Sequence, residues 1–196
     1  MPQRHGAASV SPVPAHPCSP EPPPTILKKV SSHIHDRGGA AVTAAESVRE
    51  PGPGATADRF RTAVHDGDLA ALDALFTDDI RFYSPVKFTP FEGKPLVLGL
   101  FRVLLRTFED IRYVGHHDGS SGTSTDGTEA PSAALIFRAN VNGKQIHGLD
   151  LLHLDEDGRI KEFTVMVRPQ SAVQALGEAV LAGLVADGLV PAPPGH

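Results

Sequence analysis

The segment from Gln145 to Arg168 (QIHGLDLLHLDEDGRIKEFTVMVR) constrains the fold of this chain more than any other stretch. Within it, residues 155–158 (DEDG) separate two runs that are rich in Leu, Ile, Val and Phe. Because glycine adopts the left-handed conformation that closes such short turns, the pattern predicts a β-hairpin with Gly158 in its turn. The chain is therefore expected to contain an antiparallel sheet in its second half.

One residue of the first predicted strand, Asp150, does not fit its surroundings. Successive side chains of a strand alternate between two faces, so Asp150 shares a face with apolar positions. These positions are Ile146, Gly148, Leu152 and Leu154. A carboxylate on an apolar face costs free energy unless it is paired, hydrogen-bonded or protonated. Asp150 is therefore the first candidate for a functional residue.

Composition excludes several classes of protein. The chain has 196 residues, 40% of them hydrophobic, and a formal net charge of −5, with no basic block that would favour nucleic acid. No apolar run reaches the roughly 18 residues of a membrane span. Cys18 is the only cysteine, which excludes an internal disulfide and a thiolate metal cluster. The first residues lack a signal-peptide pattern, so a cytoplasmic location is expected.

Residues 1–55 differ in composition from the rest of the chain. Ten of the eighteen prolines lie here, with Gly, Ser and Ala filling much of the remainder. Such a segment cannot bury enough apolar surface to offset its ordering entropy, so we predict a disordered tail. We interpret the His33 and His35 pair within it as a tail feature rather than a metal site. The predicted domain spans 56–187, and a second short tail, 188–196, follows it.

From residue 56 onward, the hydrophobic spacing changes between helical and strand periods. It predicts helices at 57–66, 69–76, 95–107 and from about 171, and strands at 80–84, 111–117, 133–141 and on both sides of 155–158. The Gly, Ser and Thr-rich stretch 119–132 is expected to be a loop. Thr56 and Asp68 are expected to cap the first two helices, because their side chains can accept hydrogen bonds from free N–H groups.

Two turns set the expected strand register. Asn142-Gly143 is a strong two-residue hairpin signal, and counting back from it places Leu135 opposite Asp150 and Phe137 opposite Gly148. If Gly158 forms the usual bulge in the second hairpin, Thr164 lies beside Asp150 and Met166 beside Gly148.

The predicted fold class is α+β. A curved antiparallel sheet forms a cone with about four helices, three before the main strands and one at the C-terminus. In this register the outer sheet face is apolar as well and comprises Ile136, Leu149, Leu151, Phe163 and Val165. Because a large bare apolar face usually marks an association surface, we expect a homodimer through the outer sheet face.

This order of elements resembles a known family. The segments AVHDGDLAALDALFTDDI (63–80) and LDLLHLDEDGRI (149–160) are similar to the nuclear transport factor 2-like superfamily, over roughly residues 57–186. Its SnoaL-like branch includes bacterial polyketide cyclases and lies close to the ketosteroid isomerases. The resemblance implies a cone whose helix-lined interior is a small-molecule pocket.

The comparison with ketosteroid isomerases carries over only in part. Asp150 matches the aspartic acid of their oxyanion hole, which donates a hydrogen bond while protonated. The tyrosine on the first helix of that family is matched here by Phe60, and the aspartate base by Ser84, before Pro85. The resemblance therefore implies that steroid isomerisation by that mechanism does not occur in this chain.

Two interpretations of Asp150 remain open at this stage. In one, it is a structural carboxylate that hydrogen-bonds Thr164 or Ser84 or pairs with an arginine. In the other, it is an acid/base or a hydrogen-bond donor toward a ligand carbonyl, with its pKa raised by burial. The residues expected to line the ligand site are Phe60, Phe82, Ser84, Phe101, Leu135, Phe137, Leu152, Thr164, Met166 and Arg168. Arg168 lies near the end of its predicted strand, where it would either meet an anionic ligand group at the pocket mouth or bridge to an acidic residue at the start of the following helix.

Other polar residues give weaker signals. His147 is expected to pair with Arg138, and His153 with Lys161, at exposed or interfacial positions. The sequence lacks an H-E-x-x-H motif, a phosphate-binding glycine loop and a nucleophile elbow, so no metal and no cofactor is expected.

Two classes of function follow from these observations. One is a cofactor-free isomerase, polyketide cyclase, dehydratase or hydrolase that acts on a hydrophobic, carbonyl-bearing metabolite. The other is a binding, dimerisation or assembly module that uses the same cone without chemistry. An apolar pocket with one titratable group suits both.

Deleting residues 1 to about 55 should leave the melting temperature almost unchanged, because the segment lacks a core-forming pattern. Differential scanning calorimetry of the full and shortened chains checks this. A loss of several degrees would mean that the tail packs on the domain.

Overall fold

The computed structural model of the chain describes residues 52–192. The predicted disordered tail up to residue 51, with Cys18, His33 and His35, lies outside the described residues, as do residues 193–196. Structure begins slightly earlier than the spacing predicts, because Pro53 opens the first helix. A truncation that tests the tail should therefore stop at residue 51.

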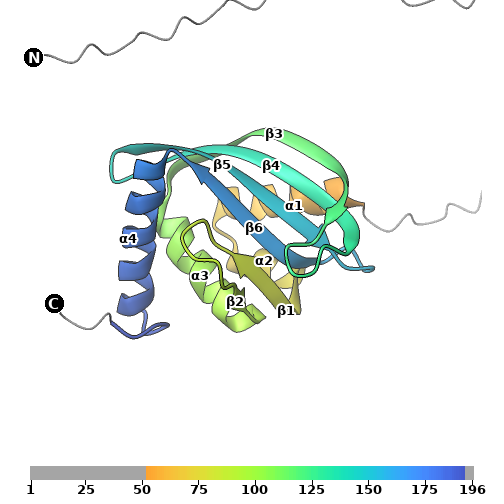
Figure 1. Ribbon diagram of the computed structural model, residues 1–196, viewed down its shortest axis with the longest axis horizontal. Helices are drawn as coiled ribbons and strands as arrows, with labels where there is room; N and C mark the ends of the chain where they lie inside the picture. Colours follow the sequence, from red (N-terminus) through yellow and green to blue (C-terminus); the bar gives the residue numbers. More distant parts are fainter. Residues whose placement is uncertain (1–51, 193–196) are drawn as a thin grey trace, which may run out of the picture. The chain divides into compact units, whose positions relative to one another are not determined.

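The described part has four helices and six strands in one sheet (Figure 1). In chain order they are α1 Pro53–Asp66, α2 Leu69–Leu75, β1 Phe76–Tyr83, β2 Phe91–Glu92, α3 Lys94–Thr107, β3 Glu109–Gly122, β4 Glu129–Val141, β5 Lys144–Leu154, β6 Ile160–Arg168 and α4 Gln170–Ala186. No helix within residues 52–192 is long and apolar enough to cross a membrane.

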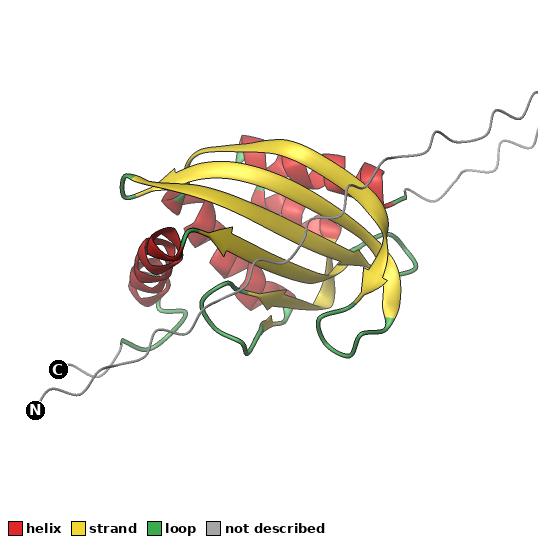
Figure 2. Cartoon of the chain, turned by 45° about the horizontal axis from the view of Figure 1, so that its top comes forward, coloured by secondary structure: helices red, strands yellow, loops and turns green. Residues whose placement is uncertain are grey.

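The sheet has the order β2-β1-β6-β5-β4-β3. Strands β3 to β6 form an antiparallel meander, and β1 adds in parallel to β6. Figure 2 shows the sheet curving over helices that lie on its concave side. This arrangement confirms the predicted α+β cone.

Of the two predicted helix N-caps, the structure confirms Asp68 and contradicts Thr56. The Asp68 carboxylate caps α2 by accepting hydrogen bonds from the N–H groups of Ala70 and Ala71. Thr56 does not cap α1, because it lies inside the helix and is fully buried. Its hydroxyl group donates to the carbonyl of Gly158 at 2.8 Å and so ties α1 to the β5–β6 turn.

The stretch 119–132 is not the loop that its composition predicts. Ser120 and Ser121 pair with β4, and only the turn between Gly122 and Glu129 interrupts the ladder. Pairing with a neighbouring strand overrides the weak strand propensity of Gly and Ser at these positions.

The two hairpins differ in how well their register was predicted. Leu135 pairs with Asp150 and Phe137 with Gly148, as the Asn142-Gly143 turn predicts. In the second hairpin, Asp150 pairs with Val165 and Gly148 with Val167, so the predicted placement of Thr164 and Met166 beside them is wrong.

The cause is a β-bulge at Lys161. His153 pairs with Glu162 and Leu154 with Ile160, which leaves Lys161 without a partner on β5. One extra residue exchanges the two faces of the strand that follows it. Phe163 and Val165 therefore point inward and are buried, although they were expected on the outer face.

The C-terminal end of helix α4 contacts helix α3. Arg106 forms two hydrogen bonds of 2.9 Å with the Asp187 carboxylate, and a Cβ at Gly183 would lie 2.5 Å from Val103. Leu189, beyond the helix end, packs against the core. The predicted C-terminal tail from residue 188 is therefore partly structured.

The outer sheet face carries a half-exposed apolar surface, but the residues that form it differ in part from those predicted. Ile136, Leu149 and Leu151 lie there as predicted and are partly buried, and Met166 replaces Phe163 and Val165. The Met166 side chain is 56% exposed. An association through this face remains a prediction.

A dimer through the outer face has a direct test. In such a dimer Leu149 and Met166 would be buried between the two chains, and an arginine at either position would place a charge in the interface. Leu149→Arg or Met166→Arg should therefore convert the dimer to monomers, as measured by sedimentation at micromolar concentration. Val86→Arg is the matched control, since Val86 is 52% exposed but lies outside the sheet, and this variant should sediment as wild type does. A stable wild-type monomer would overturn the assignment.

Candidate functional site

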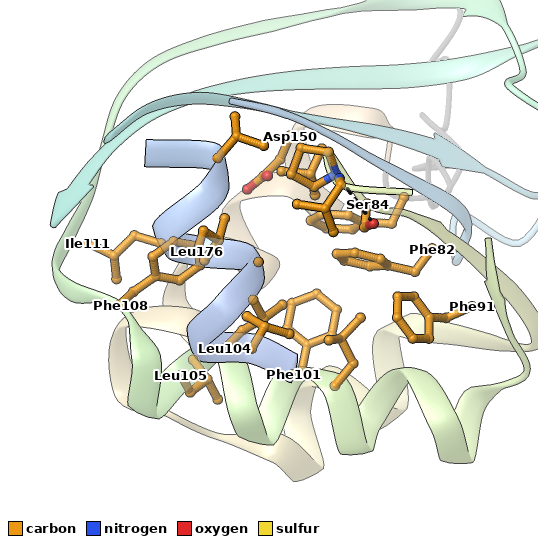
Figure 3. A pocket seen from close by; sticks show the side chains of 18 of the residues that line it. Phe82, Ser84, Phe91, Phe101, Leu104, Leu105, Phe108, Ile111, Asp150 and Leu176 are labelled. Carbon is orange, nitrogen blue, oxygen red and sulfur yellow. Dashed lines mark hydrogen bonds between the residues drawn. The ribbon is translucent and has the colours of Figure 1, made fainter. Parts of the chain in front are cut away.

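An apolar cavity of about 700 Å³ lies between the concave sheet face and helices α3 and α4 (Figure 3). Seven of the nine phenylalanines of the chain line it. These are Phe60, Phe82, Phe91, Phe101, Phe108, Phe137 and Phe163. Several pack edge to face with one another, and Phe82 stacks on Phe163 with ring centroids 5.2 Å apart. Most of the aromatic side chains of the protein therefore line this one cavity.

Asp150 is the carboxyl group inside this cavity. It lies on β5 between Leu135 of β4 and Val165 of β6, and it is 5% exposed. Figure 3 shows its carboxyl group pointing into the space between Leu176 and Phe82. The polar lining residues Lys87, Gln170, Gln174 and Glu178 are all exposed, so they belong to the mouth of the cavity.

Tyr113 of β3 is the hydrogen-bond partner of Asp150. Its hydroxyl group donates to Asp150 Oδ2 at 3.1 Å. Burial and the Asp150 carboxylate both raise the pKa of Tyr113 well above its ordinary value, so Tyr113 stays protonated and remains a donor. The Arg61 guanidinium, whose carbon lies 6.0 Å from the Tyr113 ring centroid, opposes this rise.

Burial dominates the electrostatics of Asp150. Removal from water raises its pKa from 3.8 to about 7, and the hydrogen bond from Tyr113 opposes part of this rise. Near neutral pH the group is therefore present in both its acid and its carboxylate form. A carboxyl group with such a pKa can donate a hydrogen bond or move a proton under physiological conditions.

The structure separates the predicted site residues into three groups. Phe60, Phe82, Ser84, Phe101, Phe137 and Asp150 line the cavity. Leu135 and Leu152 are fully buried in the core and do not line it. Thr164, Met166 and Arg168 lie on the opposite sheet face, because the bulge at Lys161 exchanges the faces of β6.

Thr164 and Ser84, the hydroxyl partners that the sequence suggested for Asp150, make other contacts, and so does Arg168. The Thr164 hydroxyl lies 2.7 Å from Ser124 Oγ, and Arg168 Nε donates to His147 Nδ1 at 3.0 Å. Ser84 Oγ accepts long hydrogen bonds from the N–H groups of Val86 and Lys87, so it holds the turn after β1.

Sequence reasoning missed Tyr113. Its strand was predicted, but β3 and β5 are not neighbours, since β4 lies between them. The contact with Asp150 therefore depends on the curvature of the sheet, which brings the side chains of alternate strands together over its concave face. A possible signal was that Tyr113 is one of only two tyrosines in the chain.

A second buried polar cluster lies on the outer sheet face. His153 was expected to be exposed beside Lys161, but it is fully buried beside Glu162. Its Nε2 lies 3.0 Å from Ser121 Oγ, and Glu162 accepts hydrogen bonds from Ser124 and Thr125. These contacts hold the β3–β4 turn against the sheet, and burial lowers the pKa of His153.

Comparison with known proteins places the chain in a family. Residues 57–163 match the model of the SnoaL-like domain. The chain belongs to the SnoaL-like family. No curated protein matches the sequence significantly.

Two solved structures resemble this SnoaL-like chain closely. A steroid delta-isomerase from Pseudomonas aeruginosa is 33% identical, with 70% of this chain and 95% of that chain covered and a TM-score of 0.61. An uncharacterised protein with a cystatin-like fold from Silicibacter pomeroyi DSS-3 is 28% identical, with 68% and 88% covered and a TM-score of 0.59. Both are similar over nearly the whole described domain.

The raised pKa of Asp150 predicts a pH-dependent stability. The folded state binds the Asp150 proton more tightly than the unfolded chain does, so this stabilisation is complete below about pH 4. It is lost as the pH rises through about 7. The full effect of a shift from 3.8 to about 7 is of order 4 kcal/mol.

Chemical denaturation of wild type and Asp150→Asn across this pH range measures the effect. The free energy of unfolding of wild type should fall relative to that of the variant as the pH rises from 4 to 8, since the amide does not titrate. A difference that is constant with pH, or that grows toward pH 8, would show that Asp150 is an ordinary acid.

Proposed function

We propose that the cavity binds a flat, hydrophobic, carbonyl-bearing small molecule, and that protonated Asp150 donates a hydrogen bond to the ligand carbonyl. The observation that carries this proposal is the position of Asp150, a carboxyl group with a pKa near neutrality inside an otherwise apolar cavity. An apolar site gains orientation and specificity from a small number of placed polar groups.

Tyr113 supports this role by directing the acid proton of Asp150. Its hydroxyl group donates to Oδ2, so Oδ2 is an acceptor and the acid proton resides on Oδ1. Within residues 52–192, none of the hydrogen bonds involves Oδ1. That oxygen is thus available to donate to a ligand in the cavity.

The cavity walls favour a ligand with fused or conjugated rings. Aromatic side chains offer flat faces and edges that pack best against other rings, and seven phenylalanines line this space. A volume of about 700 Å³ suits a molecule of several rings. The steroid delta-isomerase from Pseudomonas aeruginosa, which is 33% identical, makes a four-ring ketone a sensible first candidate.

A second candidate function is isomerisation, and the pKa of Asp150 favours it. The carboxylate form would remove a proton from the carbon next to the ligand carbonyl and return it to another carbon of the conjugated system, with no net change in atoms or charge. Asp150 cannot donate to the carbonyl and act as the base at once. The two roles therefore predict opposite dependences on pH.

The test uses androst-4-ene-3,17-dione, a four-ring ketone whose ultraviolet absorbance shifts to longer wavelength when its conjugated carbonyl accepts a hydrogen bond. Wild type should bind it with this shift at pH 6, and binding should weaken as the pH rises through about 7. Asp150→Leu removes the donor and should weaken binding by about tenfold or more. Asp150→Asn keeps a donor and should bind without pH dependence.

Controls separate the hydrogen bond from simple apolar packing. The same ring skeleton without oxygen should bind wild type and Asp150→Leu equally. Asp66→Asn, which neutralises an exposed carboxylate on α1, should behave as wild type does. Equal binding of the dione to wild type and Asp150→Leu would refute the proposal. A turnover of an unconjugated isomer that rises with pH through about 7 would support the isomerase instead.

A further inference from the structure

Gly148 lies directly beneath the ring of Phe137. The two residues are paired across β5 and β4, and both face the concave side of the sheet. A Cβ atom at position 148 would lie 2.1 Å from Phe137 Cζ and 2.3 Å from Cε1. Real side chains do not approach so closely, so the Phe137 ring occupies the space that any side chain at 148 would take.

The Phe137 ring in turn supports the aromatic wall beside Asp150. It packs edge to face against Tyr113, with ring centroids 6.2 Å apart, and against Phe108, with centroids 5.9 Å apart. All three rings line the cavity. Tyr113 is the residue that donates to Asp150 Oδ2. Gly148, Phe137, Tyr113 and Asp150 therefore form a contiguous series of contacts.

We infer that Gly148 is a positioning and specificity-determining residue, whose missing side chain lets Phe137 lie flat on β5, keeps Tyr113 on Asp150, and preserves the cavity space beside the carboxyl group. The specificity part of this inference rests on the proposed function of the cavity. The positioning part concerns the ligand-free protein and stands by itself.

A single methyl group tests the inference because the ring must respond to it. To reach an ordinary contact distance, Phe137 Cζ must retreat from 2.1 to 3.4 Å, which is 1.3 Å. Phe108 and Tyr113 both pack against the ring, so the ring moves into the cavity or against Tyr113. Either movement removes space beside Asp150 or disturbs the hydrogen bond from Tyr113.

The first experiment measures the titration midpoint of Asp150 by carbon-13 NMR in ligand-free wild type and Gly148→Ala. The hydrogen bond from Tyr113 lowers the pKa of Asp150 and burial raises it, so loss of the bond and a fuller cavity act in the same direction. Gly148→Ala should therefore raise the midpoint by about 0.5–1 pH unit.

Two further variants separate positioning from general destabilisation. In the Phe137→Leu background the shorter side chain no longer reaches the new methyl group, so Gly148→Ala/Phe137→Leu should have the same midpoint as Phe137→Leu alone. Gly115→Ala is the matched control, because its Cβ would meet Ile136 Cδ1 at 3.1 Å in the same sheet but on the outer side. An unchanged midpoint in Gly148→Ala, an equal rise in Gly115→Ala, or the full effect of Gly148→Ala persisting in the Phe137→Leu background would each overturn the inference.

The second experiment measures specificity with two ketones of different size. Gly148→Ala should lose about tenfold or more of its affinity for androst-4-ene-3,17-dione and less than about threefold for the two-ring 2-acetylnaphthalene. An equal loss for both probes would refute the specificity role. Failure of both ketones to bind wild type would refute the proposed function itself, whereas the titration midpoints test Gly148 without any ligand.

Discussion

The Asp150 carboxyl group is buried in the concave face of the sheet with one hydrogen-bond donor, the hydroxyl group of Tyr113. A buried carboxylate would require several donors or a cation to remain charged near neutral pH, and neither is provided inside the cavity. The domain instead holds this group partly protonated, with a pKa of about 7. The chemistry we propose for the cavity depends on this balance between burial and a single neutral donor.

The surrounding fold maintains that balance through strand register. The bulge at Lys161 turns Phe163 and Val165 toward Asp150 and sends Thr164 and Met166 to the outer face. Without the extra residue, a hydroxyl group and a thioether would lie beside the carboxyl group, and burial would be less apolar. One unpaired residue on β6 therefore decides the polarity of the cavity and the composition of the outer face together.

The fold and the position of Asp150 on the inner sheet face could be predicted from the sequence, because both depend on short sequence patterns such as turns and alternating apolar residues. The two-residue turn at Asn142-Gly143 permits one register, and the pairing of Phe137 with Gly148 follows from it. In the second hairpin, Ile160 still pairs with Leu154, but the bulge at Lys161 has no local signature, so the β6 side chains that follow it were predicted to lie on the wrong face. The contact between Tyr113 and Asp150 spans two strands and arises from sheet curvature, which no local pattern encodes.

Infrared difference spectroscopy of the ligand-free protein detects the protonated form of Asp150, with Asp150→Asn as the reference that lacks the carboxyl group. The carbonyl band of the protonated Asp150 carboxyl group should persist well above the pH at which exposed carboxyl groups ionise and should disappear with a midpoint near pH 7. Tyr113→Phe, which removes the donor, should move that midpoint upward. A wild-type midpoint near the ordinary value of about 4 would show that the cavity does not hold Asp150 as an acid near neutral pH.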